Sequence, residues 1–387
     1  MAENWQVAGF GLYVHWPFCE AKCPYCDFNS HVTRSVDHDR WRQAFLSEIS
    51  RVSAQTGPRV LSSIFFGGGT PSLMPPDLVG EVIDAAQTAW VPANDLEITL
   101  EANPRSVEAG RFQGFRDSGV NRISMGLQAL NDRDLRKLGR LHSVAEAKAA
   151  YDTARSLFDR ISFDLIYARQ DQGREDWAAE LSEALAMAAD HLSLYQLTIE
   201  RGTAFWERDR KGALPGLPDE DLAADLYEMT QTQCEAAGLA AYEVSNHAKP
   251  GSESRHNLIY WRHGDYAGIG PGAHGRLTID GSRIGTEAWR NPGAWLDAAC
   301  KGDGTRVTSQ LPLAEQATEY LMMGLRLREG LDLPRLHAMD PAIADPGKRT
   351  ALTADGLLWE QDHRMGATEQ GRLLLNSLIA ALMPDDA

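Results

Sequence analysis

The sequence predicts an α/β fold in which parallel strands alternate with helices, and two observations carry this prediction. Six short runs rich in apolar and β-branched residues recur along the first half of the chain, and stretches with helical spacing separate them. Strands that alternate with helices pair in parallel through right-handed crossovers. Six such units are too few for a closed eight-fold barrel, so the pattern favours an incomplete barrel or a doubly wound sheet. The predicted strands are residues 11–15, 60–66, 96–100, 120–125, 161–166 and 191–197.

The first two connecting segments show the apolar spacing of amphipathic helices. In each segment, apolar residues recur every three or four positions and so share one helix face. Both candidate folds carry their chemistry at the carboxyl ends of the parallel strands, so we expect the functional site there. The apolar faces are Trp41, Phe45, Ile49 and Val52 in the first helix and Leu78, Val82, Ile83 and Ala86 in the second.

The pattern changes after residue 202, and it predicts three regions. These are the strand and helix units at 1–202, an extension at 203–312 and a C-terminal α+β domain of winged-helix-like type at 313–387. Helices are predicted at 219–237 and 313–327, and a small hairpin around 356–359. The Gly-, Trp- and His-rich stretch 242–275 fits no simple secondary structure. We interpret the C-terminal domain as a packing module without a nucleic-acid role.

The composition excludes several classes of protein. The 387 residues are 43% hydrophobic and 24% charged, which is typical of a globular chain. Lys and Arg number 38 against 54 Asp and Glu, giving a net charge of −16, so the overall field repels nucleic acid. No apolar run is long enough for a bilayer, and the N-terminal residues lack the features of a secretory signal. We therefore expect a soluble, cytoplasmic protein.

Three of the five cysteines form the strongest chemical signal. Cys19, Cys23 and Cys26 are spaced C-x3-C-x2-C directly after a predicted strand, where a loop can surround a soft metal centre. A structural zinc site needs four ligands, and the other two cysteines are remote, so zinc is the weaker interpretation. Three thiolates on a 4Fe–4S cluster would leave one iron open to an outside ligand. His15 and His31 are candidates for that fourth position.

Polar groups follow several of the later strands. A glycine run, Gly67-Gly68-Gly69-Thr70-Pro71, ends the second strand and allows the backbone to approach a ligand closely. It matches neither the P-loop nor the dinucleotide-binding spacing, and a tight turn would also explain it. Glu101, Gln128 and Asp164 lie at or near the ends of the next three strands. Such convergence on one rim predicts a shared ligand.

Five motifs in chain order resemble those of radical S-adenosylmethionine (SAM) proteins. Within that superfamily the chain is similar to the oxygen-independent coproporphyrinogen III oxidase group, and most similar to its HemW family of heme chaperones. The resemblance covers nearly the whole chain, through 191–200, 242–246 and 268–275. It implies a partial (β/α)6 barrel of the radical SAM type. The motifs are Tyr13 to Cys19, the three-cysteine segment, the glycine run, Glu101-Ala102-Asn103-Pro104 and Gly126-Leu127-Gln128.

The resemblance implies a 4Fe–4S cluster held by Cys19, Cys23 and Cys26, with SAM chelating the fourth iron through its amino and carboxylate groups. Glu101 would accept from an ammonium group, and Tyr25 would pack beside adenine. Reductive cleavage of SAM would yield a 5′-deoxyadenosyl radical, chemistry that belongs to the cofactor while the protein excludes water. No catalytic residue of the chain itself is predicted. The positions that match SAM contacts are Tyr13, Tyr25, Gly68, Gly69, Thr70, Glu101, Gln128, Arg140 and Asp164.

Two features favour the chaperone over the oxidase. The oxidase motif continues to a further cysteine two residues after the third, where this chain has Phe28. The segment from His256 to Trp261 resembles the HNxxYW signature associated with the heme chaperone, and an exposed imidazole beside Tyr and Trp suits a heme. His256 is therefore the predicted axial ligand, with His247 and His263 as alternatives. A loop histidine bonded within the protein is the simpler explanation from composition alone.

The predicted function is a carrier that binds heme and passes it to apo-hemoproteins such as respiratory enzymes, with cluster and SAM gating the transfer. The alternatives are an oxidase that decarboxylates coproporphyrinogen III and a radical SAM enzyme with another substrate, so enzymatic activity stays open. A peripheral membrane contact would be needed if the acceptors are membrane-bound, although no amphipathic basic helix indicates one. The sequence leaves the oligomeric state, including a homodimer, open.

One segment departs from the family pattern. Family members usually follow the aspartate with Tyr-Gly-Leu-Pro-Gly-Gln, whereas this chain reads Tyr167-Ala168-Arg169-Gln170-Asp171-Gln172. The length is kept, but two glycines and the proline are lost. Because glycine adopts positive φ without strain and other residues do not, the geometry of this loop is in question.

Overall fold

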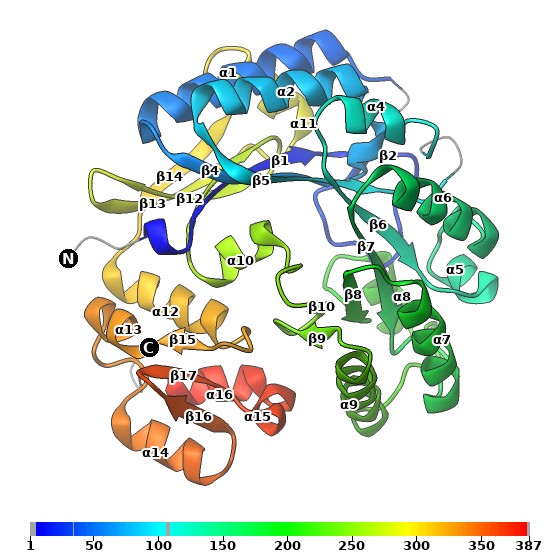
Figure 1. Cartoon of the computed structure of the whole chain (residues 1–387), viewed down its shortest axis with the longest axis vertical. Helices are drawn as coiled ribbons and strands as arrows, with labels where there is room; N and C mark the ends of the chain where they lie inside the picture. Colours follow the sequence, from blue (N-terminus) through cyan, green and yellow to red (C-terminus); the bar gives the residue numbers. More distant parts are fainter. Residues whose placement is uncertain (1–4, 34, 106–108, 385–387) are drawn as a thin grey trace.

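A computed structural model describes residues 5–33, 35–105 and 109–384 and contains a twelve-stranded sheet (Figure 1). Its central strands, from β11 to β8, pair in parallel, and the outer strands pair antiparallel. Across the sheet the strands are β14 (Thr305–Gln310), β13 (Ser282–Ala288), β12 (His274–Ile279), β11 (Asp265–Ile269), β1 (Phe10–Trp16), β4 (Val60–Gly68), β5 (Val91–Ala102), β6 (Arg122–Gln128), β7 (Arg160–Tyr167), β8 (His191–Gln196), β10 (Asn246–Ala248) and β9 (Ala240–Ala241).

The six strands predicted from the sequence are all present, and they lie side by side in chain order as β1, β4, β5, β6, β7 and β8. A doubly wound sheet reverses its strand order at a switch point, so this order identifies a partial barrel. Among the described residues the sheet ends at β14 and at β9 without closing. Figure 1 shows the sheet as an arc with most helices on its outer face and α10 (Arg255–Trp261) inside.

The stretch that the sequence pattern did not resolve adds a seventh parallel strand. β11 pairs with β1, with Phe10 opposite Asp265, and β12 to β14 continue the sheet beyond it. β9 and β10 extend the other edge beside β8. The segment 203–312 therefore lengthens the sheet at both edges, and the boundary at 202 stays a prediction.

The outer helices are formed as the apolar spacing predicts. All eight predicted core positions of α1 (His38–Thr56) and α2 (Pro76–Ala89) are buried against the sheet. The Asp37 side chain caps α1 by accepting from the backbone N–H of Arg40, which satisfies a donor at the helix start. The other helices of this part are α4 (Phe112–Asp117), α5 (Asp132–Lys137), α6 (Val144–Leu157), α7 (Arg174–Met187), α8 (Ala204–Asp209), α9 (Glu220–Ala236) and α11 (Pro292–Ala299).

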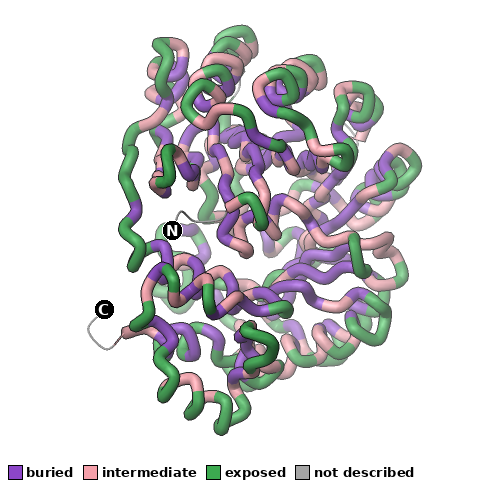
Figure 2. The backbone as a smooth tube through the Cα atoms, turned by 60° about the vertical axis from the view of Figure 1, so that its left-hand side comes forward, coloured by how far each residue is buried: buried purple, intermediate pink, exposed green. Residues whose placement is uncertain are grey.

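The C-terminal region has a hydrophobic core of its own around a three-stranded sheet. The predicted helix at 313–327 and the predicted hairpin are both present, as α12 and as β16 with β17. Figure 2 shows buried backbone along the large sheet and exposed turns on the outer helices. No helix in the described part of the chain combines the length and apolar character needed to cross a bilayer. The elements are α12 (Leu313–Gly324), β15 (Leu331–Asp332), α13 (Leu333–Met339), α14 (Pro346–Ala354), β16 (Leu358–Gln361), β17 (Arg364–Ala367), α15 (Glu369–Leu373) and α16 (Leu375–Leu382).

Candidate functional site

The carboxyl ends of β4 to β7 meet the cysteine loop at a pocket of about 150 Å³. Residues from six separate parts of the sequence converge there, four of them at or near strand ends, as the strand-end argument predicts. The pocket is lined by the three predicted cluster ligands and by eight of the nine positions predicted to contact SAM. These lining residues are Cys19, Cys23, Cys26, Tyr25, Gly68, Gly69, Thr70, Glu101, Gln128, Arg140 and Asp164. Their roles toward a cofactor remain predictions.

A chain of hydrogen bonds links two of the thiols. The Thr70 hydroxyl donates to Cys19 Sγ at 3.3 Å and accepts from Asn103 Nδ2 at 3.2 Å. The Asn103 carbonyl accepts from the Arg140 guanidinium at 2.5 Å, and that guanidinium also lies 3.5 Å from Cys23 Sγ. The sequence motif that contains Asn103 does not indicate a role for this residue. Its position in the chain of hydrogen bonds shows that it positions Thr70 and Arg140.

Two of the three thiols hold their protons more tightly than a free cysteine does. Burial raises the pKa of Cys19 and of Cys26, although the Thr70 hydroxyl favours the Cys19 thiolate. The thiolate is the form that binds metal, so bound cations are needed to hold these groups ionised. Within the described residues, no three His, Cys, Asp or Glu side chains are arranged to hold a single metal ion. A 4Fe–4S cluster is a larger group in which each iron takes its own thiolate.

Two buried carboxyl groups give the pocket a preference for positive charge. Burial, and to a smaller extent the nearby Asp164, raise the pKa of Glu101 to about 8, while the Gly68 N–H donates to Glu101 at 3.2 Å. Burial also raises the pKa of Asp164 to about 6. When two carboxyl groups lie close together in a desolvated site, their ionised forms are stabilised by a cationic group that binds between or beside them. The pocket is therefore suited to a ligand that carries an ammonium or similar group.

The glycine run is required by packing within the chain itself. Gly68 has φ 113°, and a Cβ there would lie 2.5 Å from the His15 ring. A Cβ at Gly69 would lie 2.8 Å from the Phe18 carbonyl oxygen. Close approach to a ligand is thus not the only reason for glycine here. Gln128 is the more unusual residue of the rim. Its backbone has φ 72°, in the left-handed region that residues other than glycine rarely adopt, and such strained residues often mark functional sites.

Tyr13 and the two candidate histidines do not line the pocket. The Tyr13 hydroxyl contacts His15 Nδ1 at 2.9 Å, and the other nitrogen of His15 lies 3.0 Å from the Asn29 carbonyl. His31 contacts the Asn29 side chain. In this conformation neither His15 nor His31 presents a nitrogen to the cysteines.

The prediction of an exposed imidazole at His256 is wrong. His256 is only 1% exposed, and its two ring nitrogens lie 2.8 Å from the Ser63 and Tyr260 hydroxyls. Its ring stacks on Phe65 with centroids 4.9 Å apart. The physical reason is that α10 packs inside the arc against β4, which turns the first residue of the signature inward. Burial lowers the pKa of His256 to about 3, so the ring is neutral at physiological pH. The alternatives His247 and His263 are also buried, at 0% and 3% exposure.

The altered loop after β7 keeps the backbone that glycines would adopt. Ala168 has φ 56° and Asp171 has φ 59°, which is the left-handed region expected from the family pattern. Arg169 is 2% exposed and holds the loop by ion pairs to Asp134 and Glu180. The lost glycines therefore introduce strain without a change of path.

Ala168→Gly is expected to change the free energy of unfolding by less than about 1 kcal/mol. Glycine relieves a left-handed strain of roughly 1–2 kcal/mol. The variant also loses roughly 0.8 kcal/mol of methyl burial and roughly 0.5–1 kcal/mol through the freer unfolded chain. Urea unfolding of both proteins measures the difference. A gain above about 2 kcal/mol would show that the strain is larger than these typical values.

Sequence profiles of known families match two regions of the chain. The Radical SAM superfamily profile matches residues 13–183, and the HemN C-terminal domain profile matches residues 311–374. The first match contains the cysteine loop and the pocket, and the second covers the C-terminal region from α12 to α15 but not α16.

Curated relatives match almost the full chain. The chain is 41% identical to "Radical S-adenosyl methionine domain-containing protein 1, mitochondrial" of Mus musculus, covering 96% of this chain and 87% of that protein. It is 39% identical to "Heme chaperone HemW" of Escherichia coli strain K12, covering 97% and 98%. Among solved structures, coproporphyrinogen III oxidase (HemN) from Escherichia coli superposes with a TM-score of 0.80 at 22% identity, covering 98% of this chain and 92% of that one. The last comparison confirms the radical SAM fold.

Proposed function

Because the chain belongs to the radical SAM superfamily, in the family of HemW and mitochondrial radical S-adenosyl methionine domain-containing protein 1, we propose that it carries heme to apo-hemoproteins. In this proposal Cys19, Cys23 and Cys26 hold a 4Fe–4S cluster, and SAM binds beside it. The observation that carries the cofactor assignment is the convergence of the three thiols with Glu101 and Asp164 in one pocket.

The residues of the pocket suit both groups. Three partly buried thiols on one loop can each bind one iron, and the Arg140 guanidinium lies 3.5 Å from the Cys23 sulfur. Glu101 and Asp164 supply negative charge for the ammonium and sulfonium groups of SAM. Bound SAM would supply radical chemistry after reductive cleavage. The chain's own contribution is to bind, to orient and to exclude water.

The coproporphyrinogen oxidase is the alternative function. Its cluster motif continues to a further cysteine, where Phe28 stands in this chain, 59% exposed at the pocket. A turnover assay with coproporphyrinogen III, SAM and a reductant separates the two functions. We expect no product at enzymatic rates. Steady decarboxylation would overturn heme carriage as the sole function.

His256 is the proposed axial ligand of the heme, and the structure sets a condition for that role. One of the hydrogen bonds to Ser63 and Tyr260 has to break before a ring nitrogen can reach an iron. We expect His256→Ala to lower the free energy of unfolding by about 2 kcal/mol, since it removes a packed ring and leaves two buried hydroxyls unpaired. Thermal unfolding of the heme-free protein measures this loss.

Hemin titrations should therefore use His256→Gln, whose amide can replace both hydrogen bonds. Stoichiometric binding by the anaerobically reconstituted protein, followed by visible absorption, supports the proposed function. A weaker and spectrally altered complex in His256→Gln supports the ligand role. An unchanged Soret band in that variant would contradict it, while heme carriage would stand.

A further inference from the structure

A second, larger cavity of about 800 Å³ adjoins the cysteine pocket. The two share part of their lining, including Tyr25, Cys26, Phe28, Glu101 and Asp164. The rest of the cavity wall comes from Asp27 and Ile166, the end of β8 with the residues after it as far as Glu200, the segment before β10, and the C-terminal region. No C-terminal residue lines the cysteine pocket. The larger cavity therefore extends from the cysteine loop to the C-terminal region, which does not line the smaller pocket. Its volume lies within the usual range of ligand sites.

Large apolar side chains are exposed along this cavity. Phe28 is 59% exposed, Leu374 50%, Tyr195 42% and Leu373 38%, and all four line it. Most large apolar residues of the chain are buried in its cores. Exposed apolar groups gathered on a concave surface usually mark a binding site. The wall composition thus suits a ligand with a large apolar surface.

Two arginines without acidic partners line the same cavity. Among the described residues, no carboxylate lies within ion-pair distance of Arg326 or Arg372. The Arg326 guanidinium lies 5.7 Å from the Trp261 ring centre. Burial lowers the pKa of the Arg372 guanidinium, and the neighbouring Arg328 lowers it as well. A partly desolvated guanidinium without a counter-ion favours binding of a carboxylate or another anion.

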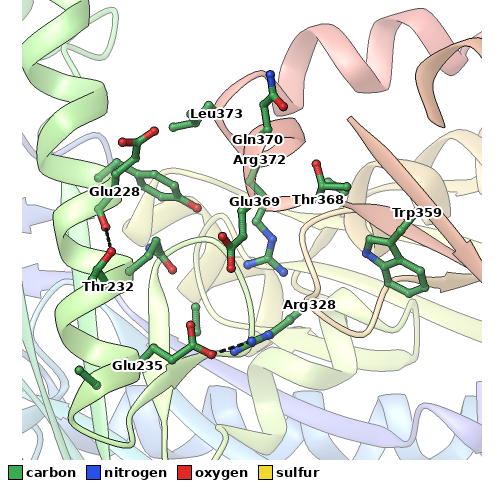
Figure 3. A pocket seen from close by; sticks show the side chains of 15 residues that line it. Glu228, Thr232, Glu235, Arg328, Trp359, Thr368, Glu369, Gln370, Arg372 and Leu373 are labelled. Atoms are coloured by element: carbon green, nitrogen blue, oxygen red, sulfur yellow. Dashed lines mark hydrogen bonds and ion pairs between the residues drawn. The ribbon is translucent and has the colours of Figure 1, made fainter. Parts of the chain in front are cut away.

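Arg372 lies between two cavities. Arg372 and Leu373 also line a neighbouring cavity of about 690 Å³ between α9 and the C-terminal hairpin. Figure 3 shows Arg372, Glu369 and Arg328 among the side chains that line this neighbouring cavity, and Arg328 is paired with Glu235 at 2.8 Å. Arg326 lines only the cavity that reaches the cysteine loop. The end of α15 thus separates the two cavities.

We propose that the 800 Å³ cavity takes heme with its propionate edge against Arg326 and Arg372 and its other edge toward the cysteine loop. The orientation follows from the placement of the cationic groups, because the two guanidinium groups attract carboxylates at the C-terminal wall, whereas the wall shared with the cysteine pocket contributes the carboxyl groups of Glu101 and Asp164 and no cationic side chain among the described lining residues. The exposed apolar side chains contact the macrocycle. This assignment rests on heme carriage and adds the place and orientation of the cargo. His256 lines neither this cavity nor the cysteine pocket, so a heme held here is not ligated by His256, and the His256→Gln titration distinguishes the two placements. This orientation keeps the propionates away from the SAM pocket. A carrier that does not decarboxylate its cargo requires such a separation.

The test compares hemin with its dimethyl ester, which lacks both carboxylate charges. We expect Arg326→Gln and Arg372→Gln each to weaken hemin binding by about tenfold and to leave ester binding within about twofold. The matched control is Arg174→Gln, because Arg174 forms an exposed ion pair with Asp225 outside both cavities. Its affinity for hemin should equal that of the unchanged protein. Circular dichroism of each variant checks the fold, and if Arg372→Gln fails to fold, Arg326→Gln decides.

The possible results of this test distinguish the proposed orientation of heme from the proposed function of heme carriage. If the unchanged protein binds hemin and both arginine variants bind it equally well, the orientation is overturned while heme carriage stands. Equal losses for hemin and ester would also overturn the orientation, since the effect would not depend on carboxylates. If the unchanged protein binds no hemin, the proposed function fails and this inference fails with it.

Discussion

Cys23→Ala is expected to abolish the broad visible charge-transfer absorption of the anaerobically reconstituted protein and most of its bound iron. Cys23 is the middle residue of the three-cysteine motif, and its thiol lines the pocket with the other two. A cluster with only two protein thiolates loses the ligand beside Arg140, whose guanidinium lies 3.5 Å from the Cys23 sulfur. Iron and sulfide analysis with the absorption spectrum measures the effect.

Cys300→Ala is the matched control for this experiment. Cys300 is a free, partly buried cysteine outside the pocket, and its thiol lies 3.7 Å from the Arg40 carbonyl. Its variant should retain full absorption and iron. A full iron complement in Cys23→Ala would defeat the cluster assignment.

Glu101→Gln is expected to weaken SAM binding by about a hundredfold. The loss follows from removing a carboxylate that would accept hydrogen bonds from a charged ammonium group, worth about 1.5–3 kcal/mol. Equilibrium binding of SAM to the reconstituted protein measures it. Glu183→Gln, which removes an acid from an exposed ion pair with Lys148, serves as the control and should bind SAM normally. Unchanged affinity in Glu101→Gln would remove this residue from the SAM site.

Glu101→Gln is also expected to raise the stability of the ligand-free protein. The pKa of Glu101 is about 8 in the folded state, against an ordinary value near 4.5. A carboxyl group with a raised pKa binds its proton more tightly when folded, so stability falls as pH rises from about 4.5 to about 8. Glu101→Gln removes this dependence. We expect the variant to gain on the order of 1–2 kcal/mol relative to the unchanged protein between pH 5 and pH 8. Parallel stability profiles would refute the raised pKa.

The sequence predicted the elements whose periodicity is local. The helix faces of α1 and α2 follow from apolar spacing alone, and the six strands from short apolar runs. The pocket was predictable for a related reason: parallel strands end at one edge, so Glu101, Gln128 and Asp164 had to meet there.

The features that the sequence did not predict depend on distant packing. β11 is a five-residue strand whose place beside β1 depends on a partner some 250 residues away. The burial of His256 depends on where α10 packs, which its own seven residues do not specify. Arg326 and Arg372 carry no local motif, and only the C-terminal domain's position brings them to a shared cavity. Long-range contacts of this kind override local pattern.

The place of β1 in the sheet has a consequence for biosynthesis. β1 leads directly into the cysteine loop, and it is flanked by β4 on one side and by β11 on the other. Because chains fold as they emerge from the ribosome, β1 can gain its first neighbour early but its second only after residue 269 has been made. Such pairing between segments far apart in the sequence is slow to form. The loop that would hold the cluster therefore gains its full support late in synthesis, and metal insertion is expected to follow completion of the sheet.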